Sequence, residues 1–240
     1  MPYPMARRIL GKIRHVILST SHNFIFVHVP KTAGTAMMTA LEPFGYSPKR
    51  TIWRSILRRL PVQQAPDKVY LRKHETAAWA RRKLSPEVFD DFSRFAVVRN
   101  PYDHAVSHYE FMKQFRIPHI AEKIAAMPFA EYLRYRQKPP FWNDTFFARL
   151  PDQAHFLVDA SGHSLVPRIL RYETLADDFD SVVADLGMGE VALPRINKTK
   201  SRSDKKPWQS YFDDETKALA EQLYARDFDL FGYARDIPDP

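Results

Sequence analysis

One lysine, one glycine and two threonines stand between an apolar run and a stretch of helical composition in the segment Phe24–Met38, which reads FIFVHVPKTAGTAMM. Backbone N–H groups at a helix N-terminus lack intrahelical partners, and the helix dipole adds positive charge, so such a turn attracts anions. Lys31 supplies a cation, Thr32 and Thr35 supply hydroxyl donors, and Gly34 permits close backbone approach and a positive φ. The segment predicts a phosphate-binding strand, loop and helix.

A second turn of similar design lies in the segment Arg94–Tyr109, which reads RFAVVRNPYDHAVSHY. An apolar run ends at Arg99, and Asn100-Pro101 turns the chain into a helix. The guanidinium of Arg99 can hold a phosphate with two parallel hydrogen bonds, and its charge is permanent. Ser107 lies early in the helix, where we expect it to face the strand end, and Asp103 is expected as an N-cap or first-turn acid.

Of the nine histidines, His74 stands between these two turns. It follows a strand-like stretch at Lys68–Leu71 and precedes a helix expected at Glu75–Lys83, and strand ends are where α/β proteins gather site residues. A neutral imidazole there can act as a general base. His28, beside the first loop, is the alternative base, or else a wall of the site or a hydrogen-bonded core residue.

The residue order in the first loop differs from the Walker loop of nucleotide kinases. In that pattern, G-x-x-x-x-G-K-[ST], the lysine follows the glycines, whereas Lys31 precedes Gly34. The absence of cysteine excludes disulfides, thiolate metal sites and a cysteine nucleophile, and there is no HExxH motif to indicate zinc. We therefore expect chemistry without a metal ion.

The composition sets further bounds. The chain has 240 residues, of which 45% are hydrophobic and 13% aromatic, enough for one large buried core. Its net charge of +8 attracts anions such as nucleotides, acidic glycans, nucleic acid or anionic lipid. No apolar run approaches the ~20 residues of a membrane span, and no clear signal peptide is present. We expect a soluble, cytoplasmic chain.

Apolar runs alternate with stretches of helical composition along the chain. Strands are expected at Asn23–Val29, Lys68–Leu71, Arg94–Val98, Ala154–Val158 and Ser164–Leu170. Helices are expected at Thr35–Leu41, Glu75–Lys83, Asp103–Phe115, Phe129–Arg136, Thr174–Leu186 and Asp214–Phe228. This alternation predicts an α/β fold, a P-loop-like single domain at residues 23–240 with a central parallel sheet flanked by helices, after a lead-in at residues 1–22.

The loop HVPKTAGT resembles the H-[IV]-P-K-T-G-G-[TS]-[ST] loop of carbohydrate sulfotransferases related to heparan sulfate 2-O-sulfotransferase. In that family the loop cradles the 5′-phosphosulfate of the donor 3′-phosphoadenylyl sulfate (PAPS), and 3′-phosphoadenosine 5′-phosphate (PAP) is the product. The resemblance implies donor-binding roles for Pro30, Lys31, Thr32, Ala33, Gly34, Thr35 and Ala36. Ala33 replaces a frequent glycine, which restricts φ, and Ala36 replaces a frequent Ser or Thr, which removes one hydroxyl donor.

The second turn resembles the family's V-R-N-P-Y-D-R-x-[VL]-S-x-Y segment, which implies that Arg99 and Ser107 bind the 3′-phosphate. His104 stands where the family often has arginine, so the positive charge there is weaker or absent near neutral pH. The sequence around His74 resembles the K-H-x-[ST]-A element, whose histidine is the proposed general base. Lys31 would then neutralise charge on the leaving phosphate oxygen.

The C-terminal third carries weaker signals. The stretch Ile169–Phe179 resembles a strand-to-helix element of the same family, in which Tyr172 and Glu173 brace the site, pack in the core or cap a helix. The stretch Leu193–Asp204 resembles the family's L-P-x-x-N-x-[ST] segment, and Lys198 with its basic neighbours would close over the nucleotide or meet an anionic acceptor. The resemblance extends from about residue 23 to residue 233.

The residues are also consistent with two other functions. A phosphotransferase of related architecture would bind ATP with a metal ion, and a non-catalytic polyanion-binding protein would lose affinity steeply with salt. No RNP-type motif or zinc finger indicates nucleic acid. For a sulfotransferase, the resemblance implies a carbohydrate hydroxyl as the acceptor, and the basic stretches favour an acidic saccharide. The acceptor's identity and the oligomeric state are left open by the sequence.

Overall fold

The computed structural model describes residues 18–45, 51–57, 59–138, 147–194 and 206–239. Within these ranges, four strands form one sheet in sequence order: β1 (Leu18–Ser19), β2 (Phe24–Val27), β3 (Ser93–Val98) and β4 (Arg168–Arg171). β2, β3 and β4 are parallel, and β1 pairs antiparallel with β2. The predicted α/β class is confirmed. The sheet also includes two residues of the expected lead-in, as an antiparallel edge strand.

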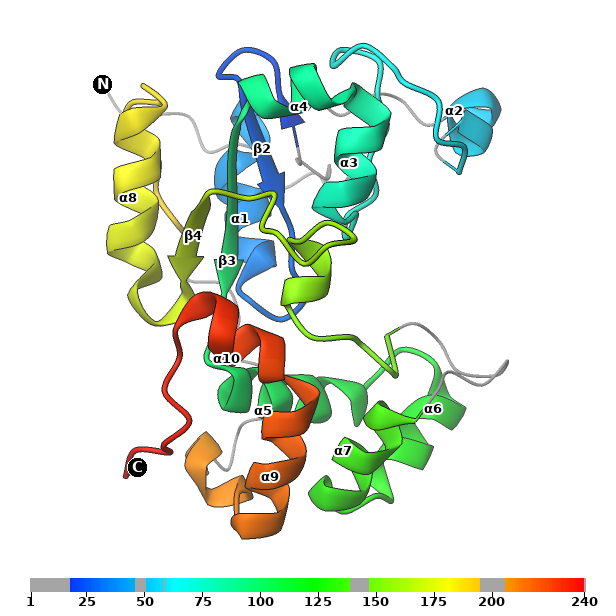
Figure 1. Cartoon of the computed structure of the whole chain (residues 1–240), viewed down its shortest axis with the longest axis vertical. Coiled ribbons are helices and arrows are strands. Elements are labelled where there is room, and N and C mark those ends of the chain that lie inside the picture. The colour runs from blue at the N-terminus through cyan, green and yellow to red at the C-terminus, as the bar shows by residue number, and fades with distance from the viewer. Residues whose placement is uncertain (1–17, 46–50, 58, 139–146, 195–205, 240) are drawn as a thin grey trace, which may run out of the picture.

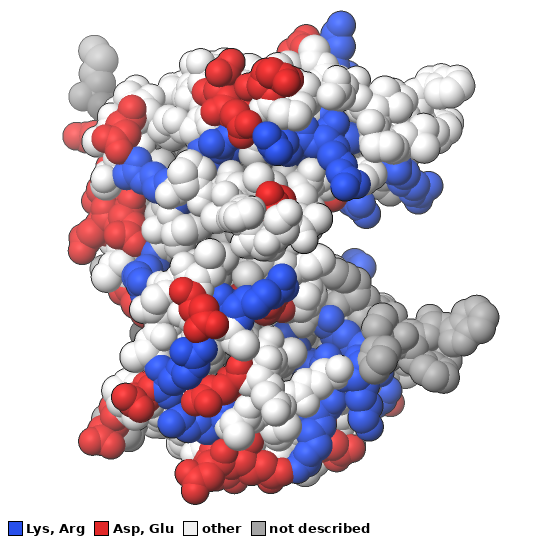
Figure 2. Space-filling view, viewed as in Figure 1, with Lys and Arg blue, Asp and Glu red and all other residues white. Residues whose placement is uncertain are grey.

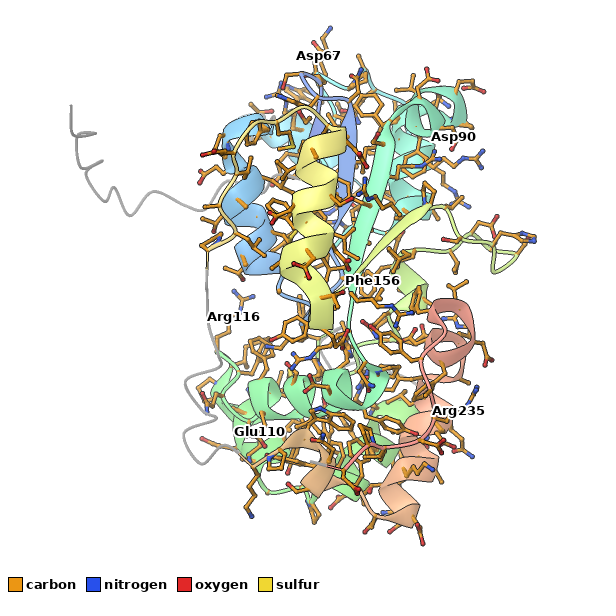
Figure 3. The ribbon with its side chains drawn as sticks, turned by 90° about the vertical axis from the view of Figure 1, so that its left-hand side faces the viewer. Asp67, Asp90, Glu110, Arg116, Phe156 and Arg235 are labelled. Atoms are coloured by element: carbon orange, nitrogen blue, oxygen red, sulfur yellow. The ribbon has the colours of Figure 1, made fainter. Side chains whose placement is uncertain are left out.

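One face of the sheet is covered by two helices, α1 (Gly34–Leu41) and α8 (Leu175–Asp185), which lie side by side in Figure 3. Alternate residues of a strand point to opposite faces. Phe26 and Phe95, which pair across β2 and β3, both point to this face, and their ring centroids are 5.5 Å apart. These rings join the sheet to methionine, leucine and valine side chains of the two helices.

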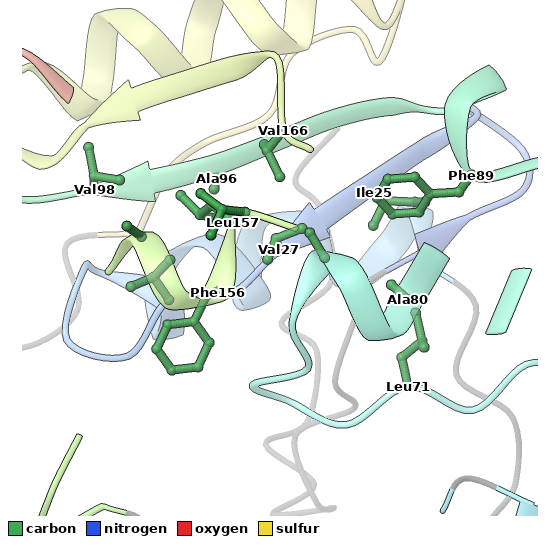
Figure 4. Packing of buried hydrophobic residues seen from close by; sticks show 14 of the residues in the cluster. Ile25, Val27, Leu71, Ala80, Phe89, Ala96, Val98, Phe156, Leu157 and Val166 are labelled. Carbon is green, nitrogen blue, oxygen red and sulfur yellow. The ribbon is translucent and has the colours of Figure 1, made fainter. Parts of the chain in front are cut away.

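The other face packs against α3 (Ala77–Leu84) and α4 (Pro86–Asp91), as Figure 4 shows. Ile25 and Val27 of β2 and Ala96 of β3 are fully or almost fully buried there. Because both faces of β2 and β3 are covered, these strands are apolar at every position along their buried length. This is why their continuous apolar runs were sufficient to predict them.

A second group of helices lies beyond the carboxyl ends of the parallel strands (Figure 1). It comprises α5 (Pro101–Met112), α6 (Pro118–Ala125), α7 (Phe129–Gln137), α9 (Asp214–Leu223) and α10 (Ala225–Phe231). Aromatic side chains dominate its packing, with Tyr102, Tyr132 and Tyr224 fully buried. The carboxyl end of β3, which leads directly into α5, therefore lies between the sheet and this helical group.

The remaining elements are short. One further helix, α2 (Ile52–Leu57), projects from the body beside α3 (Figure 1). The 3-10 turns are η1 (Glu42–Phe44), η2 (Ala154–Phe156), η3 (Tyr172–Thr174) and η4 (Trp208–Tyr211). No described helix combines the length and the apolar composition that a membrane crossing requires.

Polar side chains explain where several helices begin. Thr76 and Ser85 accept hydrogen bonds from the first turns of α3 and α4, and Asp213 forms a capping box at the start of α9. Asn100 Oδ1 accepts from the Tyr102 N–H at 3.0 Å and is the N-cap of α5. Of the two roles expected for Asp103, the structure gives it that of a first-turn acid.

The strand predicted at Lys68–Leu71 is wrong. Val69 and Leu71 are buried against the core as a strand would bury them, but no neighbouring strand pairs with them. Instead, the N–H groups of Lys68 and Val69 both donate to the Ala65 carbonyl in a tight turn. Alternating burial alone therefore imitated a strand at this position.

The strand predicted at Ala154–Val158 is also wrong, because Ala154–Phe156 forms the 3-10 turn η2 and only Val158 makes an isolated bridge, to Ser164. The Asp227 carboxylate accepts the Ala154 N–H at 2.8 Å, which favours the turn. The single helix predicted at Asp214–Phe228 is divided at Tyr224, whose φ of −117° ends α9. Helix α6 was not predicted.

Candidate active site

The loop after β2 has two residues with left-handed backbone geometry, Lys31 (φ 68°) and Ala33 (φ 61°). A Cβ atom disfavours this region, so each conformation must be maintained by its surroundings. Gly34 does not use the positive φ that a glycine permits; among the described glycines that geometry occurs at Gly162, Gly187, Gly189 and Gly232. Ala33, which the resemblance marked as a replaced glycine, is where a glycine would relieve strain.

Gly34 serves close packing instead. An ideal Cβ on Gly34 would lie 1.6 Å from Nε2 of His28, so the buried His28 ring occupies the space a side chain would need. The expected close approach at this glycine therefore involves a protein side chain, and it fixes His28 against the first turn of α1.

The first turn of α1 begins at the Ala33 carbonyl. The N–H groups of Ala36 and Met37 both donate to that carbonyl, whereas the N–H groups before them have no acceptor within the helix. Thr32 is fully buried, and its hydroxyl donates to the Val29 carbonyl at 3.0 Å, which braces the loop. Thr35 is exposed on the first turn. Thr35 therefore presents its hydroxyl outward, while Thr32 presents only its backbone.

Arg99 lies at the loop, at the carboxyl end of β3. Its Nε and Nη2 donate to Asp103 Oδ2 at 2.7 and 2.6 Å, and its Nη1 lies 3.4 Å from the Lys31 carbonyl oxygen. The guanidinium lies over the ring of Tyr172, with Cζ of Arg99 4.2 Å from the ring centroid, and this contact fixes the plane of the guanidinium. Arg99 thus joins the first loop to the second turn, as the order of motifs suggested.

Lys31 is surrounded by other cations. Its Nζ lies 4.3 Å from the ring centroid of Phe111 on α5. Burial, followed by the positive charges of Arg99 and Lys73, lowers the pKa of Lys31 from 10.5 to about 8, and burial also lowers the pKa of Lys73. Burial and these neighbouring charges disfavour the charged form of Lys31, and an anion bound beside it would reverse that effect.

Ser107 lies on the face of α5 that meets these cations. Asp103, Ser107 and Phe111 follow one another at intervals of four residues, so they form one stripe along the helix. Arg99 pairs with Asp103 at one end of the stripe, and Lys31 lies over Phe111 at the other. Ser107 is thereby placed between the two cations.

His74 contacts the first loop through His28. Its Nδ1 lies 3.1 Å from the His28 carbonyl oxygen, and the two ring centroids are 4.4 Å apart. A carbonyl only accepts hydrogen bonds, so Nδ1 carries the proton and Nε2 of the neutral ring carries the lone pair. The rings of His74 and Phe147 also pack edge to face, with their centroids 5.5 Å apart, which further fixes the His74 ring. This arrangement selects the tautomer that a base at Nε2 requires.

A buried chain of hydrogen bonds holds the loop from behind. His104 Nε2 donates to the Pro30 carbonyl at 2.9 Å, its Nδ1 pairs with the Tyr224 hydroxyl at 2.9 Å, and Arg136 Nη1 donates to that hydroxyl at 2.6 Å. Burial and the charge of Arg136 lower the pKa of His104 to about 3, so it is neutral. The structure confirms that His104 supplies no cation.

Two carboxylates position the start of α5. Glu173 accepts from the Asn100 N–H at 2.6 Å and from the Tyr233 hydroxyl at 2.9 Å, so it braces the site, as does Tyr172 beneath Arg99. The side-chain amide of Gln153 bonds to both the N–H and the carbonyl of Arg99, and Asp227 accepts from Gln153.

Sequence reasoning missed Gln153, Asp227, Tyr224 and Arg136 because they contribute from distant parts of the chain and follow no motif. Lys198 lies outside the described residues. Within those residues, no group of three or more His, Asp or Glu side chains is arranged to hold a metal ion.

The candidate site thus combines the turn at the start of α1, the cations Lys31 and Arg99 beside it, and an oriented histidine. A family model described as the sulfotransferase family matches residues 14–234. The chain belongs to the sulfotransferase family. No curated protein and no solved structure matches this sulfotransferase. Family membership indicates transfer of a sulfuryl group from a sulfonate donor to a hydroxyl acceptor.

Proposed function

We propose that the protein transfers a sulfuryl group from PAPS to a hydroxyl of a carbohydrate. The observation that carries the proposal is that Arg99, at the end of the second predicted turn, lies with its Nη1 3.4 Å from the carbonyl oxygen of Lys31, in the loop before α1. Burial, followed by the charges of Arg99 and Lys73, already lowers the pKa of Lys31, so an anion beside it fits better than a neutral ligand. The first predicted phosphate turn contributes Lys31 and the second contributes Arg99, so the two turns meet at one place.

The resemblance and the geometry together suggest how the donor would be held. Backbone N–H groups within the loop at Lys31–Thr35 and the ammonium of Lys31 would bind its 5′-phosphosulfate end, with Pro30 and Ala36 at the two edges of that loop. Arg99 and Ser107 would bind its 3′-phosphate, and the stripe on α5 supports a shared location for them. When bound, PAPS supplies the sulfuryl group together with a phosphate leaving group. Lys31 would stabilise charge at that leaving oxygen.

His74 is proposed as the general base. With Nδ1 donating to the His28 carbonyl, Nε2 is the ring nitrogen that carries the lone pair and would take the proton of the acceptor hydroxyl. His28 suits this task less, because it is buried and wedged against Gly34. Sulfuryl transfer resembles phosphoryl transfer in depending mainly on positioning and electrostatics, and a base adds roughly 10²–10⁴-fold.

A carbohydrate acceptor is supported by the surface next to the site. Figure 2 shows a notch on the right-hand side, between the part of the molecule that contains α2 and α3 and the helical group below. Lys and Arg side chains lie along the described parts of its rim. α3, the helix that follows His74 in the chain, belongs to the part of the molecule above this notch. A basic entrance favours an acidic saccharide over a neutral one.

Transfer of ³⁵S from labelled PAPS to a panel of neutral and acidic oligosaccharides tests this function. We expect product with wild type, and a loss of about 10²-fold or more in kcat for His74→Ala with unchanged affinity for PAP. His163→Ala, at an exposed histidine outside the site, is the matched control. No labelled product with any saccharide would refute the carbohydrate acceptor, and full turnover by His74→Ala would remove it as the base.

A further inference from the structure

Exposed apolar side chains gather on one short segment that contributes none of the residues of the candidate site. Within the described residues, seven large hydrophobic side chains are strongly exposed, and five of them lie between residues 52 and 62: Ile52, Trp53, Ile56, Leu60 and Val62. Ile52 is 80% exposed and Trp53 is 74% exposed. Apolar residues that cluster in this way on a soluble domain mark a surface that meets an apolar partner.

The exposure is not a consequence of a loosely attached segment. The fully buried side chain of Lys83, on α3, donates from Nζ to the carbonyl oxygens of Leu57 and Leu60, the latter at 2.9 Å. The Lys83 carbonyl accepts the Gln64 N–H at 2.8 Å. These bonds attach the end of α2 and the following turn to α3, while Ile52 and Trp53 point away from the core.

The charge around this segment selects the kind of partner. Residues 43–66 contain five Lys or Arg and no Asp or Glu. Figure 2 shows uncharged and basic side chains over the projection formed by α2. An exposed tryptophan with branched aliphatic and basic neighbours is typical of segments that lie in the interface of an anionic bilayer. Residues 1–17 contain four Lys or Arg and no acid, so like charge disfavours them as a cover for this surface.

We propose that residues 52–62 dock the protein onto an anionic lipid bilayer. Ile52, Trp53 and Ile56 enter the interfacial region, and Arg54 and Arg59 meet the lipid headgroups. The attachment is independent of sulfuryl transfer. It nevertheless orients the site, because Lys83 belongs to α3, the helix that follows His74.

Sedimentation with vesicles of phosphatidylcholine, with and without phosphatidylglycerol, tests the docking in the absence of any donor. We expect the whole chain to bind only the vesicles that contain phosphatidylglycerol, and added salt to weaken that binding. Trp53→Ser should weaken it about tenfold or more, and Arg59→Glu about fivefold or more. Since both positions are exposed, neither change should unfold the protein.

Leu230→Ser and Lys206→Glu are the matched controls, because they remove an exposed apolar side chain and a basic side chain elsewhere. Both should bind vesicles as wild type does. No binding to anionic vesicles, or equal binding by Trp53→Ser, overturns the proposal. A dimer that Trp53→Ser converts to a monomer would assign the surface to a second copy and also overturn it. The outcome does not depend on whether PAPS is the donor.

Discussion

The imidazole of His28 occupies the volume that a side chain at residue 34 would need, since an ideal Cβ on Gly34 would lie 1.6 Å from its Nε2. The carbonyl of the same histidine accepts the Nδ1 proton of His74. One buried residue therefore sets both the packing of the first turn of α1 and the tautomer of the proposed base.

Gly34→Ala should disturb this contact. The new methyl group must displace the His28 ring, and overpacking of this kind costs about 1–3 kcal/mol of unfolding free energy. Urea denaturation measures the change. His28→Ala combined with Gly34→Ala should recover part of the loss, because the clashing ring is gone. A Gly34→Ala variant as stable as wild type would contradict the described packing.

Ala33→Gly should stabilise the protein. Ala33 has a left-handed φ of 61°, and relief of that conformation is worth about 1 kcal/mol. Thermal or urea unfolding should show the gain. Ala40→Gly, at a buried position in the last turn of α1, is the control and should destabilise by about 1 kcal/mol. If both variants changed stability in the same direction, the backbone assignment at Ala33 would be wrong.

Donor affinity should fall at alkaline pH because of Lys31. Its pKa of about 8 means that the ammonium is charged below pH 8 and is lost as the pH rises through that value. PAP binding to wild type should weaken by about tenfold between pH 7.5 and 9.5, with proton uptake on binding in that range. Lys31→Arg keeps its charge and should show a flat profile. A flat profile for wild type would exclude Lys31 as the titrating cation.

Tyr224→Phe should weaken donor binding from a distance. The hydroxyl links Arg136 to His104, and His104 holds the Pro30 carbonyl. Its removal leaves buried polar groups unsatisfied and costs about 1–3 kcal/mol of stability. Tyr109→Phe is the control, because that hydroxyl bonds to the Met127 carbonyl outside the loop. Both variants should lose stability, but only Tyr224→Phe should lose PAP affinity in calorimetry. Equal PAP affinities of the two variants would show that the Tyr224 hydrogen bonds do not contribute to donor binding.

The sequence was sufficient to predict those parts of the fold that depend on a local pattern of residues. β2 and β3 are buried on both faces, so their apolar runs identify them, and Asn100-Pro101 marks the start of α5. Val69 and Leu71 show the limit, because their burial imitates a strand that has no partner to pair with. The division at Tyr224 depends on contacts with His104 and Arg136, which helix composition does not reveal.

The site was predictable to a similar extent. The motifs identified Lys31, Arg99 and His74 as candidate site residues, and the structure places all three around the first loop. The sequence did not indicate that Lys73 adds a third cation, or that Gln153 clamps both backbone groups of Arg99. Such supporting residues are selected by the folded geometry, so no spacing along the chain identifies them.

The most direct test of the central claim is calorimetric binding of PAP in comparison with adenosine 5′-phosphate. Wild type should bind PAP at least about tenfold more tightly, because only PAP carries the 3′-phosphate assigned to Arg99 and Ser107. Lys31→Ala should weaken both ligands, whereas Ser107→Ala should weaken PAP alone. Equal affinity of wild type for the two nucleotides, or no binding of PAP, would contradict a PAPS-dependent sulfotransferase.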